Sequence, residues 1–190
     1  MLNSPARYGA VAMTLHWLIA AAIIGMLILG KYMHELDDND PNKFALYQLH
    51  KSTGITILTL SVLRLVWRLV NVVPPLPAHM PAWERWAAHA SHFLLYFFTI
   101  AIPLSGWAMV SASPLGVPTI WYRVFEVPHL PGLQGLEDQE GVEESLEETH
   151  ELLGNLLIVL LIVHVGAALK HHFWDRDSVL RRMIPFTRVE

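Results

Sequence analysis

Four long apolar stretches, separated by polar links, dominate the pattern of positions along this chain. Charged residues are absent from residues 11–30, 87–112 and 152–169, and residues 55–73 contain only two. A helix needs about 20 mostly apolar residues to cross a bilayer, so each stretch predicts a membrane-spanning helix. We expect the spans at roughly residues 11–33, 45–70, 86–111 and 149–171.

The composition agrees with a membrane protein. Of 190 residues, 53% are hydrophobic and 16% charged, with a mean hydropathy of +0.37. Four helices with short links predict an all-α, integral membrane four-helix bundle formed by one domain, residues 1–190. We expect the first stretch to be retained rather than cleaved as a signal peptide, because its apolar core is longer than about 15 residues. The chain has no cysteine, which excludes disulfides and cysteine-held clusters.

The basic residues predict the orientation of the bundle. With four spans, one side of the membrane receives most of them: Arg7, Arg64, Arg68, Arg85, Lys170, Arg176, Arg181, Arg182 and Arg188. Basic residues favour the cytoplasmic side, so both termini should be cytoplasmic. The other side carries acidic links, above all residues 137–151, whose role the sequence leaves open.

Histidines at the ends of the spans are the candidates for chemistry, because an ionisable residue inside a membrane marks a functional site more often than chance. His150 and His164 lie 14 residues apart, which is about 21 Å along a helix and two heptads, so both point to nearly the same side. Depth in the membrane then pairs His50 with His150 near the outer surface, and His16 with His164 near the inner one. Two imidazoles from different helices at each level suit a planar macrocycle with a central iron, such as haem b.

Small residues one turn further on support these four positions. At i+4, His16 is followed by Ala20, His50 by Gly54, His150 by Gly154 and His164 by Ala168. A flat ring against a helix needs such a residue beside its ligand, whereas the other seven histidines lack one. Three alternatives compete: histidines buried only for packing, a zinc site, and a histidine-dependent transporter. Zinc usually takes four clustered ligands and proton-relay transporters usually add buried carboxylates, so two haem b groups are the favoured prediction.

Four segments give the chain a family resemblance. They are RYGAVAMTLHWL, HKSTGITILTLSVLRLVWR, AAHASHFLLYFFTIAIPLSGW and THELLGNLLIVLLIVHVGAALKHHFWDRDSVLRRM. With them the sequence resembles, over nearly its whole length, the bacterial cytochrome b561 family of four-helix di-haem proteins. The resemblance implies a multi-pass protein of the bacterial cell inner membrane. It also implies bis-histidine ligation by His16, His50, His150 and His164, and electron transfer linked to ubiquinone.

The resemblance also suggests further site residues. The HHFW segment lies where quinone binds in related proteins, so His171 and Lys170 are quinone candidates. Members of the family include superoxide:ubiquinone oxidoreductases. The acidic outer links would repel superoxide unless folding hides them, although Lys51 and Arg123 could form a local positive funnel. A cationic periplasmic electron donor or partner protein is the other interpretation.

Helix three and its neighbour supply the remaining candidates. His89 and His92, one turn apart, could contact the propionates of the inner haem together with Arg64 or Arg68. Hydrogen bonding at the helix start is the competing interpretation for the two histidines. Two functions remain in play: an electron carrier or small oxidoreductase, and a cytochrome b subunit that anchors a partner dehydrogenase. The expected partners are membrane lipid and quinone, with no nucleic acid.

Overall fold

Four long helices make up most of the protein. The computed structural model describes residues 2–187 and contains α1 (Ala10–Glu35), α2 (Lys43–Val70), α3 (Ala82–Ala112) and α4 (Gln139–Phe173). Each is long and apolar enough to cross a membrane, which confirms the predicted all-α membrane bundle. The helices contain the expected spans and extend beyond them, most at the start of α4, where the acidic lead-in is helical.

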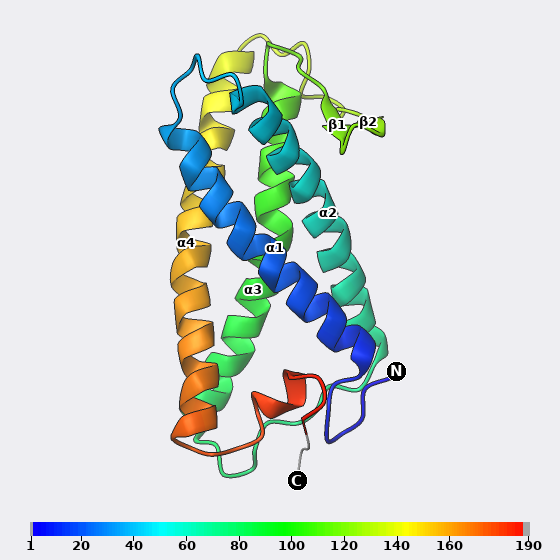
Figure 1. Cartoon of the computed structure of the whole chain (residues 1–190), viewed down its shortest axis with the longest axis vertical. Helices are drawn as coiled ribbons and strands as arrows, with labels where there is room; N and C mark the ends of the chain where they lie inside the picture. Colours follow the sequence, from blue (N-terminus) through cyan, green and yellow to red (C-terminus); the bar gives the residue numbers. More distant parts are fainter. Residues whose placement is uncertain (1, 188–190) are drawn as a thin grey trace.

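The helices pack in chain order, with α1 against α2, α2 against α3 and α3 against α4. Figure 1 shows α1 crossing the bundle diagonally, in front of the other three helices. Both ends of the chain lie at the same end of the bundle, which we call the termini end. The opposite end carries the α1–α2 link and the α3–α4 link, and we call it the hairpin end because of the β-hairpin described below.

A small apolar layer holds the middle of the bundle together. Its five buried side chains come from all four helices: Ile19, Ile23, Ile57, Phe98 and Leu157. Most other large apolar side chains are exposed, as expected where the surface meets lipid rather than water. Leu157 lies halfway along the sequence between His150 and His164, so the layer separates the two histidine levels.

Local sequence signals explain where α4 begins and ends. Asp138 caps its N-terminus by accepting a hydrogen bond from the Gly141 amide at 3.0 Å, and Glu140 adds negative charge in the first turn. Basic side chains occupy the last turn, where positive charge interacts favourably with the negative end of the helix dipole. With 35 residues the helix is about 52 Å long, so its acidic first turns extend beyond a hydrocarbon core of about 30 Å.

The α3–α4 link contains a short β-hairpin that the sequence did not predict. Strands β1 (Thr119–Trp121) and β2 (Phe125–Val127) pair antiparallel and lie beside α2 (Figure 1). Ser52 of α2 anchors it: its hydroxyl donates to the Ile120 carbonyl at 3.1 Å and accepts from the Tyr122 amide at 3.1 Å. Strands of three residues are too short to show the alternation of apolar and polar residues that identifies a strand in a sequence. The hairpin is stabilised by its contacts with α2.

The segment after α4 folds back across the termini end. It contains a short 3-10 helix, η1 (Arg181–Met183), and contacts the N-terminal part of the chain. Arg7 donates to the Ile184 carbonyl at 2.9 Å, and the Trp17 indole donates to the Met183 carbonyl at 2.8 Å. Arg188, one of the basic residues used to predict orientation, lies outside the described residues.

Candidate functional site

The structure brings His50 and His150 together at the hairpin end. Their ring centroids are 6.2 Å apart, with an angle of 70° between the ring planes. His50 comes from the second turn of α2, and His150 from the third turn of α4. The pairing that depth in the membrane predicted is therefore present at this level.

A cavity of about 270 Å³ surrounds this pair. One glycine from each helix lines it: Gly30, Gly54, Gly106 and Gly154. At Gly54 and Gly154 an added Cβ would meet no other group within 4 Å, so the space beside these two positions is open. Open backbone at Gly54 and Gly154 is the kind of surface that admits a flat ring close to the helices, whereas Gly30 and Gly106 face the rings of His50 and His150.

The two imidazoles at the hairpin end differ in their hydrogen bonds. His150 Nδ1 lies 3.0 Å from the Ile102 carbonyl and 3.0 Å from the Ser105 hydroxyl, both on α3. His50 Nδ1 is buried and has no hydrogen-bond partner among the described residues. Helix α3 therefore fixes the ring of His150 by hydrogen bonds at Nδ1, whereas the Nδ1 atom of His50 is without such contacts among the described residues.

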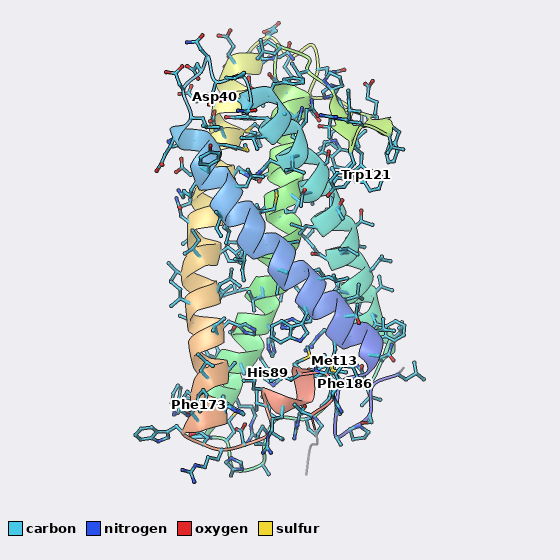
Figure 2. The ribbon with its side chains drawn as sticks, in the orientation of Figure 1. Met13, Asp40, His89, Trp121, Phe173 and Phe186 are labelled. Carbon is cyan, nitrogen blue, oxygen red and sulfur yellow. The ribbon has the colours of Figure 1, made fainter. Side chains whose placement is uncertain are left out.

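Three histidines, not two, meet at the termini end. The ring of His164 lies 6.4 Å from that of His16 and 5.9 Å from that of His92, measured between centroids. The expected partner of His164 is therefore present, together with a neighbour from α3. His89, in contrast, is exposed at the termini end of α3 (Figure 2), and its contact with a haem propionate stays a prediction.

Arginines of α2 lie near this level. Arg64 donates through Nε to the Tyr96 hydroxyl at 3.3 Å, and the guanidinium carbons of Arg64 and Arg68 lie 5.8 Å and 5.6 Å from the Tyr96 ring centroid. The Nη1 atom of Arg64 is buried without a partner among the residues that the structure describes. A buried guanidinium is costly unless an anion accepts its hydrogen bonds, so the position suits a carboxylate such as a haem propionate.

The residues present fit two haem groups. Two imidazoles that would share one metal ion, each with a bond of about 2.0 Å to it, would have ring centroids roughly 6 Å apart. The pairs His50–His150 and His16–His164 stand at 6.2 Å and 6.4 Å. The His92–His164 distance of 5.9 Å also agrees, so distance alone does not select the ligands at the termini end.

His171 and Lys170, the residues predicted to bind quinone, take part in a network of ion pairs and hydrogen bonds. His171 Nδ1 lies 2.8 Å from Asp177 and 2.9 Å from Asp175, while its Nε2 lies 3.8 Å from Glu84. Lys170 bridges Glu84 and Asp175 at 2.6 Å and 2.9 Å, and its hydrogen bond holds the pKa of the Asp175 carboxyl below its usual range. Glu84, His171 and Asp175 could hold a metal ion by spacing, but the Lys170 ammonium already neutralises two of them.

At the hairpin end, acidic and basic side chains share the rim of the cavity. Lys31 and Glu151, both exposed, form an ion pair at 3.4 Å, and Glu147 also lines the cavity. Lys51 lines it too and donates to the Pro118 carbonyl at 3.0 Å, which ties it to the chain just before β1. The acidic segment is therefore not hidden by folding, but lysines partly neutralise it at the cavity.

Sequence reasoning missed several residues of these sites. Gly30, Gly106 and Ser105 are separated by many positions from the histidines that they contact or face. A signal existed for the glycines, since glycine is unfavourable inside a helix by about 1 kcal/mol and invites a packing explanation. Ser105 had no such signal, because serine is common in membrane helices.

Comparison with known proteins agrees with these features over nearly the whole chain. A family model described as prokaryotic cytochrome b561 matches residues 7–186. Cytochrome b561 homolog 2 of Escherichia coli (strain K12) is 36% identical over 183 residues, which cover 96% of this chain and 93% of that protein. Cytochrome b561 homolog 1 of the same strain is 25% identical over 185 residues, covering 94% and 97%. A probable superoxide oxidase CybB of Yersinia pestis is 27% identical over 184 residues, covering 96% and 98%. The chain thus belongs to the prokaryotic cytochrome b561 family, multi-pass bacterial membrane proteins that transfer electrons through haem b.

Proposed function

We propose that this protein carries electrons across the bacterial inner membrane, between a periplasmic donor at the hairpin end and the quinone pool. Two haem b groups would serve as the carriers, one held by His50 and His150 and the other by His16 and His164. The observation that carries the proposal is the pair of cross-helix histidine contacts at opposite ends of the bundle, separated by the apolar layer.

Charge supports the orientation. The termini end carries Arg7 and Arg85 and the basic residues of the C-terminal segment, Arg176, Arg181 and Arg182. The hairpin end carries the acidic start of α4. Basic residues next to spans favour the cytoplasm, so the termini end should be cytoplasmic and the hairpin end periplasmic.

The protein's own groups would hold each carrier and isolate it from water. Each bound haem supplies a one-electron couple between ferric and ferrous iron. At the termini end, Arg64, Arg68 and His92 would hold the propionates, since buried Arg64 Nη1 lacks an anionic partner in the described chain. The preference for His16 over His92 as ligand rests on the residue one turn further on, which is Ala20 in one case and bulky Tyr96 in the other.

Quinone chemistry needs protons as well as electrons, and the termini end offers a route for them. His171 is hydrogen-bonded to Asp177, whose carboxylate is buried, and the ring lies near the membrane boundary on α4. Imidazole side chains commonly donate and accept protons in proteins. We therefore place quinone beside His171 and Lys170, with His171 supplying protons.

The donor could belong to either of two chemical classes. Lys31 and Lys51 on the cavity rim favour a small anion such as superoxide, the substrate class named for the Yersinia relative. A second candidate function, a membrane anchor that receives electrons from a partner dehydrogenase, is favoured by the acidic first turns of α4, which extend beyond the membrane. Such a face would attract a cationic docking surface.

Haem content of single variants tests the central proposal. Pyridine haemochrome analysis of the purified chain should give about two haems per protein, and His50→Ala or His150→Ala should reduce this to about one, because a haem with one axial ligand is easily lost. His129→Ala in the α3–α4 link is the matched control and should keep both. A ratio of about one in the unmodified protein would contradict the two-haem arrangement.

Electron transfer needs a separate test. In liposomes, pre-reduced haems should be oxidised when a soluble ubiquinone analogue is added as electron acceptor, and stopped-flow spectra would give the rate. We expect His171→Ala to keep both haems and slow this step more than His172→Ala does. Unchanged rates with full haem content would move the quinone site away from His171.

A further inference from the structure

His150 is held by α3 in a way that its partner His50 is not. We propose that Ser105, acting with the Ile102 carbonyl, is a positioning residue that fixes the ring of His150 and lowers the reduction potential of the hairpin-end haem. The inference rests on the proposed function, because it requires a haem between His50 and His150. It adds a residue that neither the sequence pattern nor the histidine spacing identified.

The geometry defines which nitrogen of His150 is left for a ligand. Its Nδ1 lies 3.0 Å from the Ile102 carbonyl oxygen and 3.0 Å from the Ser105 hydroxyl oxygen. The Ser105 hydroxyl donates its own hydrogen to the same carbonyl at 2.8 Å, so its oxygen is free to accept. Both neighbours therefore accept from the Nδ1–H group, which leaves the Nε2 lone pair of a neutral ring for iron.

Space as well as hydrogen bonding restricts this ring. Gly106 follows Ser105, and a Cβ built there would lie 3.0 Å from Cε1 and 3.2 Å from Nδ1 of His150. The ring therefore packs on the α3 backbone while its Nδ1 bonds to the preceding turn. Ser105 is itself only 9% exposed, so water competes little for these hydrogen bonds.

His50 has a looser environment on the opposite side. Its Nδ1 is buried with no partner in the described part of the chain, and a Cβ built on Gly30 would lie at an ordinary 3.5 Å from its Cε1. Acceptors on the outer nitrogen of a ligating imidazole raise its basicity and fix its orientation. His150 should therefore donate more electron density to the iron than His50 does, which stabilises the ferric state.

Removing the Ser105 hydroxyl should weaken this effect without removing a ligand. In the full-length, haem-loaded protein we expect Ser105→Ala to keep two haems and to shift the midpoint potential of the hairpin-end haem in the positive direction. The potential of the termini-end haem should not move, which makes it an internal control. Redox titration followed by optical spectroscopy gives both values, and a His16→Ala variant identifies which transition belongs to which haem.

A conservative variant separates the hydroxyl from the shape of the side chain. Ser105→Thr keeps the hydroxyl, so the potential should stay close to that of the unmodified protein. If Ser105→Ala loses the hairpin-end haem while Ser105→Thr keeps it, the positioning role is also supported. The proposal is overturned if both potentials are unchanged in a two-haem Ser105→Ala protein, or if Thr behaves as Ala does. Absence of a hairpin-end haem in the unmodified protein would instead refute the proposed function.

Discussion

Gly106 of α3 lies against the imidazole of His150 on α4. A Cβ added to this glycine would stand 3.0 Å from the ring, closer than nine in ten real Cβ contacts. The ring is in turn fixed through Nδ1, so it cannot move away without breaking its hydrogen bonds. This contact gives the helix a reason to keep glycine where alanine would be more stable by about 1 kcal/mol.

The first prediction follows from that contact. Gly106→Ala should displace the His150 ring by a few tenths of an ångström and lower the affinity of the hairpin-end site for haem. Gly30→Ala is the matched control, since its Cβ would lie at an ordinary 3.5 Å from His50. Titration of each haem-free variant with haem, monitored by the absorbance of bound haem, measures the two affinities. Equal affinities in the two variants would contradict a special role for Gly106.

A second prediction tests whether the open space beside the glycines is used. Gly154→Leu should fold, because nothing lies within 4 Å of the added Cβ, but the leucine would fill the place of a flat ring. We expect the haem to protein ratio to fall from about two to about one. Gly166→Leu on the same helix also meets no group within 4 Å and is exposed, so it should keep the full complement. A full complement in Gly154→Leu would show that the macrocycle lies elsewhere.

The third prediction separates the two histidines that face His164. If His16 is the ligand, His16→Ala should remove the termini-end haem, and His92→Ala should keep it in a six-coordinate, low-spin state. Optical spectra of the purified variants distinguish loss of the termini-end haem, a five-coordinate haem and an intact six-coordinate haem. Tyr96→Phe serves as a control for disturbance of α3, because it removes only the hydroxyl bonded to Arg64. Haem loss in His92→Ala alone would assign the ligand to α3.

The fourth prediction concerns the turn of the hairpin. Tyr122 and Arg123 have φ angles of +43° and +65°, a conformation that costs an ordinary residue about 1 kcal/mol and glycine almost nothing. Arg123→Gly should therefore stabilise the hairpin by up to about 1 kcal/mol. The Val124 amide donates to the Trp121 carbonyl at 2.8 Å within the hairpin turn. Its hydrogen-exchange rate measures how often the turn opens, and the rate should fall in Arg123→Gly.

Its control is a glycine placed where φ is ordinary. Val124→Gly should speed exchange of the hairpin amides, since it adds flexibility to the unfolded chain without relieving strain. Faster exchange in Arg123→Gly would mean that contacts of the arginine side chain outweigh the backbone strain. Such a result would point to a role for Arg123 at the hairpin end.

The sequence by itself determined the class of fold and the two histidine levels. A run of apolar residues predicts a membrane-spanning helix without reference to the other helices, because a bilayer requires each spanning segment to form all its backbone hydrogen bonds internally. With four spans, the direction of each helix alternates, which assigns every histidine to a depth. The spacing of His150 and His164 on one helix needs no tertiary information, because the rise per residue is fixed.

Only the tertiary structure decided which side chains from different helices meet around those levels. The diagonal path of α1, the approach of His92 to His164 and the contact of Gly106 with His150 depend on how the helices cross and rotate. The hairpin and the network around His171 depend on links that fold back onto the bundle. Hydropathy constrains the depth of a residue in the membrane but not its neighbours around the bundle axis, where packing and hydrogen bonding between helices determine the contacts.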